Sequence, residues 1–545
     1  MSSRPMHRAR MHTLACLAAA ASVVAAVAVL PTDADAVTAR PAPSAATPTV
    51  SGPVPGPIPA QSPALGSQVS SITPAALAAF GYTQQEFFVS GMANAYDFTA
   101  APTSDGRWAV AAVPGSQAAY RTRIEVMAPN DKHAFSGTVV VEWDNVTGGF
   151  SSLPDFVYDH DQPLEAGDIY VAVTAQFVGV QNAKLNNPKR YGSLVQPGDS
   201  YSYDIFSQAG MAVRADYRQL FDGLQPRSVL ADGESQSADR LATYVDAFAG
   251  RDNVYDGYLL HSRAATGTPL QEAPGTAMVA VGPDGELTPT SLPNGNTGLV
   301  DVPVPAIQRI RSDLAQPVLL AQTESDVYGP PNGWLGYGPA TQPDSADFRL
   351  WEIAGAAHAD DCVTNVCASD TGNVASAIAR FDDMLNPPSS FGGFLDCDSP
   401  INTGQGGYVM EAALAQLARW VETGGVGTGV PANSAPLFAG QHVGEGPNTV
   451  AQLDSQGNII GGVRTPAVDV PVATETGVAT NTPLLCVAAG TSTPLTAATL
   501  RRLYPTHQEF VTRWVIDTLR LAHEGYLTPR AATNLIAAAA RSSNP

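Results

Sequence analysis

The sequence predicts an α/β fold in which helices cover both faces of a mostly parallel sheet. Three observations lead to this expectation. Long apolar, β-branched runs at 137–146 and 167–180 are typical of strands that are buried on both faces. Segments with helical spacing, such as 202–224, lie between such runs. The chain has 545 residues, 44% of them hydrophobic, which is enough for a large core.

Strand-like runs continue along the chain, and each is followed by small or polar residues. The run at 226–235 is followed by a helical pattern at 237–249, and further runs lie at 254–262, 316–326 and 347–358. In parallel sheets, sites lie at the carboxyl ends of the strands. The residues just after each run are therefore the candidates for function.

The N-terminus has the pattern of a secretory signal peptide over residues 1–36. Basic residues precede an apolar stretch from Leu14 to Leu30, and Ala34-Asp35-Ala36 offers a cleavage site. An uncleaved anchor is the alternative. Residues 37–63 are rich in Pro, Ala and Ser and predict a disordered linker before a domain over 64–545. We expect a secreted or cell-envelope protein without stable membrane insertion after cleavage.

The charge and the cysteines limit the partners and the compartment. The net charge of −21 argues against binding to nucleic acids, because phosphates require basic patches. Four cysteines remain after the signal peptide, which favours two disulfides in an exported protein. Cys362 and Cys367 could close a small loop, and Cys397 would then pair with Cys486. A zinc site is the alternative, but no Cys-x-x-Cys spacing supports it.

Two long segments lie outside the alternating core pattern. Residues from about 264 to about 313 are rich in Pro and Gly and lie between two predicted strands, so we expect an insertion that forms a lid. Residues from about 385 to 545 include several helical patterns. We expect this C-terminal extension to pack on the core and not to form a separate domain.

Ser235 stands between a predicted strand and a predicted helix, in the stretch Gly-Glu-Ser-Gln-Ser. A nucleophilic serine at such a turn needs small residues two positions before and two positions after it, because the turn is tight. Gly233 and Ser237 meet this need, although the usual last glycine is a serine here. The alternative is that Ser235 only caps the following helix.

A nucleophilic serine needs a base, and a histidine base works best when a carboxylate orients it. His358 ends one predicted strand segment, and Glu324 and Asp326 end the one before it. The order serine, acid, histidine, each after a strand, is typical of a large class of hydrolases. We expect Asp326 to be the acid because it lies further beyond the apolar run, with Glu324 as the alternative.

Acyl transfer also needs donors for the oxyanion that forms on the substrate. The strand-to-helix turn would aim the backbone N–H of Gln236 at the reacting carbonyl. We expect the second donor in the loop after the 137–146 run, from the backbone of Asn145 or Val146. Ser207 is a competing nucleophile, but it lacks a glycine two positions before it and lies in a helical pattern.

Several of these stretches together resemble secreted bacterial alpha/beta hydrolase domain proteins, within the α/β-hydrolase superfamily. The matching stretches run from about residue 139 to the C-terminal helices: "VVVEWDNVTGG", "SYDIFSQAGMAVR", "GESQSADRLATYV", "YDGYLLHSR", "QTESDV", "WEIAGAAHADD" and "GGVRTPAVDVPVAT". The resemblance implies an α/β-hydrolase fold with an eight-stranded, mostly parallel sheet. It also implies a triad of Ser235, His358 and an acid within "TESD", as in serine esterases, and it implies no particular substrate.

These observations predict a secreted serine hydrolase that cleaves small-molecule or polymeric carboxylic esters through an acyl-enzyme on Ser235. Such chemistry requires no metal and no organic cofactor. A serine peptidase or amidase with the same triad is one alternative. A non-catalytic envelope protein on a hydrolase scaffold is another, because a fold alone does not establish an activity.

Overall fold

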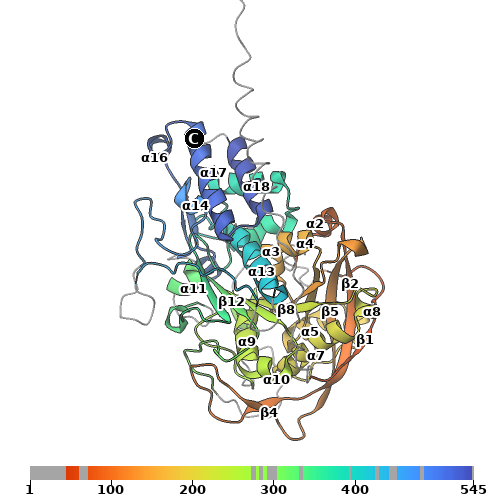
Figure 1. Cartoon of the computed structure of the whole chain (residues 1–545). Coiled ribbons are helices and arrows are strands. Elements are labelled where there is room, and N and C mark those ends of the chain that lie inside the picture. Colours follow the sequence, from red (N-terminus) through yellow and green to blue (C-terminus); the bar gives the residue numbers. More distant parts are fainter. Residues whose placement is uncertain are drawn as a thin grey trace, which may run out of the picture. The chain divides into compact units, whose positions relative to one another are not determined.

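A nine-stranded sheet organises the chain (Figure 1). The structure, a computed structural model, describes residues 45–59, 71–271, 278–281, 287–290, 303–329, 335–391, 395–423, 429–440, 451–478 and 484–542. The strands follow the spatial order β1-β2-β5-β7-β6-β8-β9-β12-β13. Their bounds are β1 Thr49–Ser51, β2 Tyr82–Ala93, β5 Ala118–Pro129, β6 Thr138–Trp143, β7 Ile169–Val173, β8 Ser228–Glu234, β9 Gly257–His261, β12 Val318–Thr323 and β13 Phe348–Ile353.

The six strands from β7 to β13 in this order run parallel to one another, whereas β1, β2 and β5 add antiparallel pairs at one edge. The predicted mostly parallel sheet is therefore confirmed. Because the parallel strands end at the same edge, the residues that follow β6, β8, β9, β12 and β13 come together there. The candidate residues are among them.

The N-terminal edge of the sheet differs from the prediction in two ways. The sheet has nine strands where eight were expected, and β1 lies within the segment 37–63 that we predicted to be a linker. Thr49, Val50 and Ser51 pair antiparallel with Ser90, Val89 and Phe88 of β2. The linker prediction is wrong at these positions, because Val50 is buried against β2 and the short strand is thereby tied to the core.

The core lies on both faces of the sheet, because side chains alternate along the buried strands. Val139 and Val141 of β6 face one hydrophobic cluster, and Val140 faces the other. The helices, including the single-turn ones, are α2 Pro74–Ala79, α3 Pro154–Asp159, α4 Asp161–Ala166, α5 Phe177–Asn186, α6 Pro188–Tyr191, α7 Ser202–Ala215, α8 Tyr217–Leu220, α9 Gln236–Tyr244, α10 Gly250–Asp252, α11 Glu324–Tyr328, α12 Val374–Leu385, α13 Gly406–Glu422, α14 Pro466–Asp469, α15 Leu484–Ala488, α16 Ala497–Leu503, α17 His507–Glu524 and α18 Pro529–Arg541.

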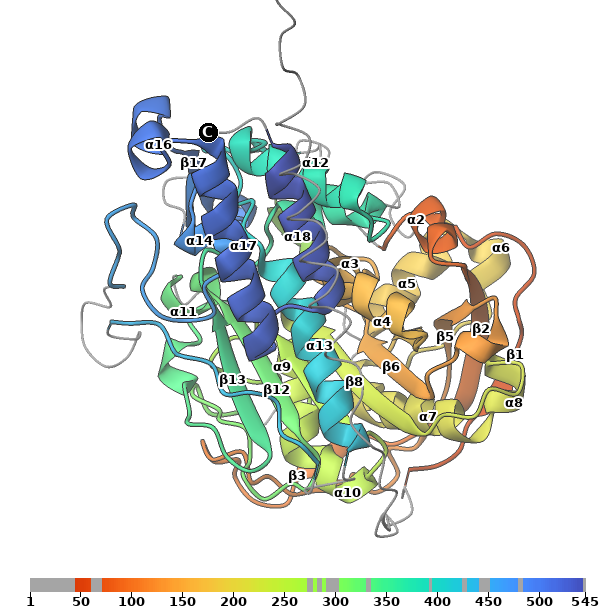
Figure 2. The ribbon, with the colours of Figure 1, turned by 45° about the horizontal axis from the view of Figure 1, so that its top comes forward.

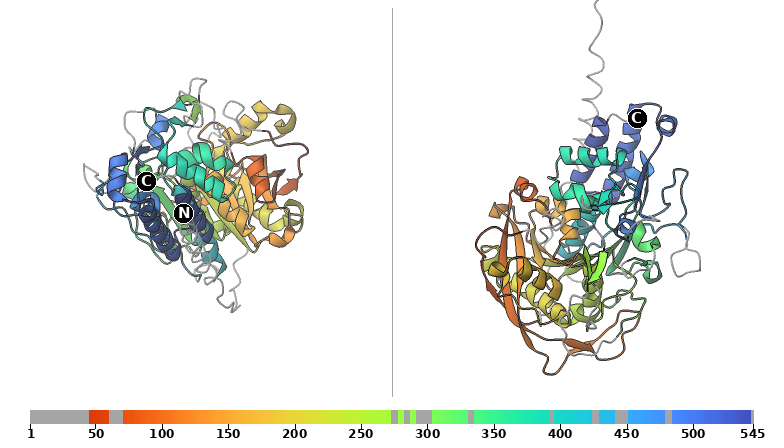
Figure 3. Two further views of the ribbon diagram at one scale, coloured as in Figure 1. Left: turned by 90° about the horizontal axis from the view of Figure 1, so that it is seen from above. Right: turned by 180° about the vertical axis from the view of Figure 1, so that it is seen from behind.

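Helices α7 and α9 cover the first face, and α3, α12, α13, α17 and α18 contribute to the cluster on the second. Figure 2 shows α13 in front of β8 and β12, which it contacts. Figure 3 shows the same layers from above and from behind. The described helices α12, α13, α17 and α18 of the C-terminal segment therefore pack on the core, and α13 forms part of one of the two helical layers.

Short strands and irregular helical turns complete the described elements. The short strands pair as β3 with β4, β10 with β11, β14 with β15 and β16 with β17. Their bounds are β3 Tyr96–Phe98, β4 Val110–Ala112, β10 Met278–Val281, β11 Leu287–Thr290, β14 Ser390–Phe391, β15 Leu395–Asp396, β16 Ala473–Thr476 and β17 Thr491–Pro494. The 3₁₀ and π turns are η2 Lys132–Ala134, η3 Asp199–Tyr201, η4 Val245–Ala249, η5 Gly338–Ala340, η6 Cys362–Val366 and η7 Cys367–Ser369.

The expected lid falls largely outside the described residues. Within 264–313 the structure describes the two ends and the hairpin of β10 and β11. The ends are held by Arg263, which donates to the backbone oxygens of Ala265 and Gln308. That this insertion covers the site stays a prediction.

The four cysteines of the expected mature chain form two disulfides, Cys362–Cys367 and Cys397–Cys486. The pairing agrees with the sequence prediction. The first bridge closes a loop with a sequence separation of 5, and the second joins residues 89 apart. Such bridges are typical of proteins from oxidising compartments. None of the helices in the described ranges combines the length and the apolar character that a bilayer-spanning segment needs.

Candidate active site

Ser235 lies at a sharp turn between β8 and α9. Its backbone has a φ of 57° and a ψ of −120°, a strained conformation for a residue with a side chain. A glycine suits position 233 beside this turn, because a Cβ there would lie 3.2 Å from the backbone of Ser237, a tight contact. The side chain of Ser235 does not cap α9. The interpretation of Ser235 as a plain helix cap is therefore wrong.

Ser237, at the position where a glycine is usual, forms hydrogen bonds within the turn. Its Oγ accepts a hydrogen bond from the N–H of Glu234 at 3.1 Å and donates to the carbonyl oxygen of Glu234 at 2.8 Å. Ser237 is fully buried. This small hydroxyl therefore holds the strained peptide before Ser235 in place.

The three predicted site residues come together at the carboxyl edge of the sheet. The Oγ of Ser235 lies 2.8 Å from Nε2 of His358, and Nδ1 of His358 lies 2.7 Å from Oδ1 of Asp326. All three side chains are buried, with residue exposures of 6%, 4% and 0%. With Asp326 as the acceptor, Nδ1 carries the proton and Nε2 is free to accept from the serine.

Asp326 lies in the first turn of α11, which begins with a capping box. Its Oδ2 accepts from the N–H and the Oγ of Thr323 at 2.6 and 2.7 Å, and from the Oγ of Ser262 at 2.8 Å. Burial alone would raise the pKa of Asp326, but the hydrogen bonds from His358 and Thr323 outweigh it and hold the pKa below its usual range. Asp326 is therefore an anion, oriented toward His358.

Glu324, the alternative acid, faces a different part of the loop. Its carboxyl accepts from the N–H groups of Gly355 and Gly477 at 2.7 and 2.9 Å. Burial raises the pKa of Glu324 to about 7. Glu324 therefore ties the backbone just before His358 to the residue that follows β16, while Asp326 contacts the histidine.

The loop that carries His358 is held by contacts that the sequence did not predict. The N–H of His358 donates to Oγ of Ser325 at 3.1 Å, and the hydroxyl of Tyr158 donates to the carbonyl oxygen of His358 at 3.3 Å. The Cys362–Cys367 bridge follows a few residues later. These contacts fix the imidazole between the serine and the aspartate.

Of the two backbone groups that we expected as candidate donors in the loop after β6, only one is available to bind an oxyanion. The backbone N–H of Asn145 donates to the carbonyl oxygen of Ser152 at 2.9 Å, so it is not free for a substrate. The prediction for Asn145 therefore does not hold. Among the described residues, the N–H groups of Gln236 and Val146 have no acceptor. These two remain the candidates, and Gln236 is the first residue of α9, where the helix dipole favours negative charge.

The side chain of Asn145 instead connects the β6 loop to the serine turn. Its Nδ2 donates to the carbonyl oxygen and to Oε2 of Glu234, at 3.0 and 3.2 Å. Its Oδ1 accepts from the N–H of Thr147 at 2.8 Å. Asn145 therefore positions both the loop and Glu234.

The competing Ser207 has no histidine partner. It is fully buried in α7, and its Oγ donates to Oδ2 of Asp252 at 2.6 Å and lies 2.9 Å from the hydroxyl of Tyr244. The prediction that Ser207 belongs to the helix before the elbow strand is confirmed. Its hydroxyl satisfies neighbouring polar groups in the core.

The comparison with protein families decides what kind of protein this is. The family model of the alpha/beta hydrolase domain matches residues 50–537. The chain belongs to this family. The match confirms the resemblance noted in the sequence and the predicted α/β-hydrolase fold. No curated protein is a match for this hydrolase.

Solved structures of α/β hydrolases are similar to this chain only at a distance. One is brefeldin A esterase, a bacterial homologue of human hormone-sensitive lipase, with 14% identity, 55% of this chain and 87% of that chain covered, and a TM-score of 0.26. A serine hydrolase without a lid from Xanthomonas campestris has 14% identity, 48% and 83% coverage and a TM-score of 0.24. Est1E from Butyrivibrio proteoclasticus has 10% identity, 50% and 93% coverage and a TM-score of 0.26. Likenesses of this degree carry no argument about activity.

Beneath the serine turn, the hydrolase holds a group of buried carboxyls. The hydroxyl of Tyr170 donates to Glu142 at 2.8 Å and contacts Asp232 at 3.3 Å, while Oδ1 of Asp155 lies 2.8 Å from Nδ1 of His261. Burial raises the pKa values of Glu142 and Asp232 well above their usual range and lowers the pKa of His261 to about 4. In the part of the chain that the structure describes, no group of three or more His, Cys, Asp or Glu side chains could hold a metal ion.

Further buried carboxyls predict that the hydrolase is more stable in mild acid than at alkaline pH. Burial raises the pKa to about 7 for Asp168, Asp246 and Asp360, and to about 8 for Asp239 and Glu475. An unfolded chain would lose these protons near pH 4, so between about pH 4 and 8 the folded state binds more protons. The free energy of unfolding should therefore fall as the pH rises through these folded-state pKa values.

Thermal unfolding at constant ionic strength, from about pH 5 to about pH 8.5, measures this effect. The melting temperature is expected to decrease across the range. The net charge of −21 acts in the same direction, because self-repulsion grows as the acids ionise. A melting temperature that rises steadily with pH would show that these carboxyls are ionised and paired in the folded state.

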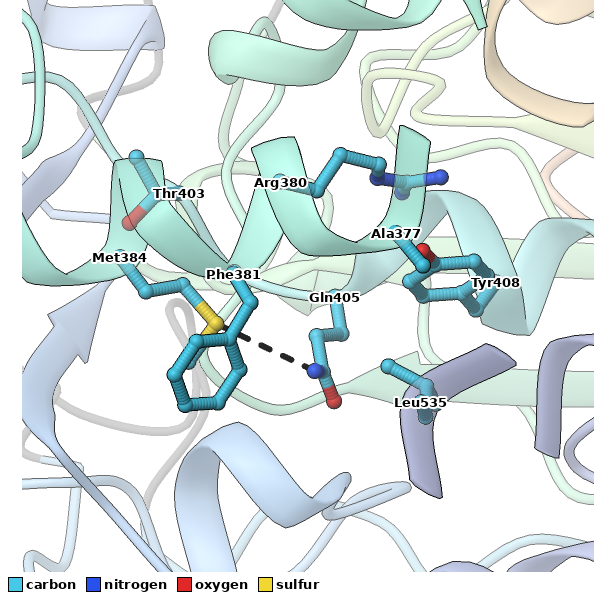
Figure 4. A pocket seen from close by; sticks show the side chains of 9 residues that line it. Ala377, Arg380, Phe381, Met384, Thr403, Gln405, Tyr408 and Leu535 are labelled. Carbon is cyan, nitrogen blue, oxygen red and sulfur yellow. Dashed lines mark hydrogen bonds between the residues drawn. The ribbon is translucent and has the colours of Figure 1, made fainter. Parts of the chain in front are cut away.

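A small cavity lies in the C-terminal layer, and neither Ser235 nor His358 lines it (Figure 4). Its lining comes from α12, α13, α18 and the turn before α13: Ala377, Arg380, Phe381, Met384, Thr403, Gly404, Gln405, Tyr408 and Leu535. The guanidinium of Arg380 lies 3.8 Å above the ring of Tyr408. The free volume is about 10 Å³, space for about one water molecule. This cavity is too small for an ester substrate.

Proposed function

We propose that the chain is an exported serine hydrolase that cleaves carboxylic esters through an acyl-enzyme on Ser235. The observation that carries the proposal is the continuous chain of contacts from Ser235 through His358 to Asp326, at 2.8 and 2.7 Å, on a strained strand-to-helix turn. A buried serine whose hydroxyl has, among the described residues, a histidine as its one hydrogen-bond partner, with that histidine oriented by an ionised acid, is arranged as a nucleophile. Export is supported by the two disulfides and by the signal-peptide pattern over residues 1–36.

The reaction then follows from the geometry. Nε2 of His358 takes the proton of Ser235 as Oγ attacks the acyl carbon, and Asp326 stabilises the imidazolium that forms. The backbone N–H groups of Gln236 and Val146 bind the oxyanion. The imidazolium returns its proton to the departing alcohol, and the acyl group stays on Ser235. Water, activated by the same nitrogen, releases the acid.

Among acyl substrates, an ester is the one whose leaving group departs most easily from this site. The alcohol of an ester leaves with the single proton that His358 carries, whereas an amine is a poorer leaving group and depends on that protonation more strongly. A peptidase or amidase with the same triad and a non-catalytic protein on a hydrolase scaffold are the two alternatives.

A matched pair of chromogenic substrates tests the proposal. The purified protein should hydrolyse p-nitrophenyl butyrate and leave the anilide with the same acyl group, butyryl p-nitroanilide, essentially intact. Comparable kcat/KM values for both compounds would identify an amidase. No turnover of either compound, together with no reaction with a phosphonate inhibitor, would favour the non-catalytic scaffold.

A further inference from the structure

Glu234 is a second carboxyl beside the histidine, and the mechanism above does not use it. Its Oε1 lies 3.6 Å from Nε2 of His358, the same nitrogen that Ser235 contacts at 2.8 Å. Its Oε2 accepts from Nδ2 of Asn145 at 3.2 Å, which fixes the plane of the carboxyl. Glu234 is only 5% exposed. A buried acid is thus held against the nitrogen that performs both proton transfers.

The surroundings of Glu234 favour its neutral form. Burial raises its pKa well above the usual range, and nearby carboxylates raise it further, while the hydrogen bond from Asn145 acts in the opposite direction. The titratable groups that interact with it come from three elements and the histidine loop: Glu142 of β6, Asp155 and Tyr158 of α3, Asp326 of α11, and His358. A neutral acid that accepts through Oε2 presents the O–H of Oε1 toward His358.

We propose that Glu234 is a catalytic residue of the deacylation step, in which its carboxyl and Nε2 of His358 together hold the water that hydrolyses the acyl-enzyme. This inference rests on the proposed function. Two atoms 3.6 Å apart can both lie about 2.8 Å from one water molecule, the usual length of such hydrogen bonds. The water donates one hydrogen to Nε2 and accepts the hydrogen of Glu234, which leaves a lone pair for the acyl carbon.

The step balances without a further reactant. The water oxygen forms a bond to the acyl carbon as its proton passes to Nε2 of His358. The tetrahedral intermediate then breaks the bond between the acyl carbon and Oγ of Ser235, and Nε2 returns the proton to Oγ. The carboxylic acid leaves, and Glu234 keeps its own proton throughout.

Glu234 should matter in only one half of the reaction. Before acylation, Nε2 of His358 accepts directly from Ser235, so no water is needed at this position. After acylation, Oγ has lost its proton and Nε2 has no donor until the water arrives. Loss of the Glu234 carboxyl should therefore slow deacylation and leave acylation nearly unchanged.

Two substitutions separate this role from a structural one. Glu234→Gln keeps the shape, an oxygen that accepts from Asn145, and N–H hydrogens that can donate to the water. Glu234→Met keeps the volume and removes both functions. Stopped-flow hydrolysis of p-nitrophenyl acetate gives the acylation rate from the burst and the deacylation rate from the steady state, with the active sites counted by fluorophosphonate titration.

For Glu234→Met, the steady-state rate is expected to fall about tenfold to a hundredfold, as when one positioned donor is removed from an active site. The burst rate should stay within about twofold of wild type, and the mass of the quenched protein should show accumulated acetyl-enzyme. Glu234→Gln should restore most of the turnover.

Three results would overturn the role of Glu234 alone: equal losses in the burst and the steady state, equal losses in both variants, or no loss in either. The first would indicate a structural role, and the second would indicate that a charge on Glu234 is needed. If the wild-type protein itself forms no acetyl-enzyme and turns over no ester, the proposed function fails, and the inference fails with it. These outcomes are distinguishable because the wild type is measured first.

Discussion

Replacing Ser235 by Ala is expected to lower kcat for ester hydrolysis by about 10⁶-fold, the order seen when the nucleophile of a serine triad is removed. Within the described ranges the hydroxyl makes one hydrogen bond, to Nε2 of His358, so its loss removes the attacking atom and little else. The fold should persist, because Gly233 and Ser237 maintain the turn. Turnover of a p-nitrophenyl ester and the melting temperature, measured on the same preparation, check both parts.

Ser207→Ala is the matched control for this prediction. Ser207 is buried like Ser235, with an exposure of 0% against 6%, but its Oγ bonds to Asp252 and Tyr244 in the core. Its loss should lower the free energy of unfolding by about 1–3 kcal/mol, because Asp252 and Tyr244 lose a buried partner. Hydrolysis should remain nearly intact. If Ser207→Ala silenced hydrolysis while Ser235→Ala did not, the assignment of the nucleophile would be wrong.

Replacing Asp326 by Asn should lower kcat by about 10⁴-fold, the loss known for the same change in a well-studied serine triad. A carboxylate accepts the proton of Nδ1, whereas an amide can place its N–H there and favour the wrong tautomer of His358. The amide would also lose the charge that stabilises the imidazolium. The fold should survive, because one oxygen can still accept from Thr323 and Ser262.

Glu324→Gln provides the comparison for the aspartate. The carboxyl of Glu324 accepts from the backbone N–H groups of Gly355 and Gly477 and from the side chain of Thr476, and an amide oxygen can keep part of this set. We expect a modest loss of stability and much less effect on kcat than for Asp326→Asn. The two kcat values and the two melting curves measure this. Reversed phenotypes would make Glu324 the acid that orients the histidine.

The parallel part of the sheet could be predicted because its strands are continuous apolar runs. The antiparallel strand β2 gives no such signal. Its sequence, "YTQQEFFVSGMA", includes the buried Glu86, whose charge is paired with Arg123 and Arg190 at 3.1 and 2.7 Å. A charged residue inside a buried strand can be recognised as a strand residue only when its ion-pair partners are known. The three-residue strand β1 could not be predicted either. It lies in a proline-rich segment, and only its pairing with β2 makes it a strand.

In the site too, residues that follow a local sequence pattern could be predicted, and residues placed by distant contacts could not. Ser235, Asp326 and His358 could be found because each follows a strand, and strand ends converge in a parallel sheet. Positions that depend on contacts between distant segments could not be found. The N–H of Asn145 donates to the carbonyl oxygen of Ser152 across a loop, and this bond could not be predicted from the residues around Asn145.

Of the residues that hold Asp326 and His358 in place, one had a recognisable sequence pattern and two had none. Thr323 and Asp326 have the spacing of a capping box, which could have indicated that a short helix begins right after the strand. Ser262 and Ser325 follow no recognisable pattern. Their roles arise because Ser262 reaches Oδ2 of Asp326 and Ser325 accepts from the N–H of His358.

We propose that Ser235 is the activated nucleophile of this α/β hydrolase. The most direct measurement is to react the folded mature protein with a fluorophosphonate and to locate the adduct by mass spectrometry of its peptides. One adduct per molecule on Ser235, absent after denaturation and absent in Ser235→Ala, is the predicted result. An adduct on Ser207 or another serine, or no adduct on a folded protein, would contradict the claim.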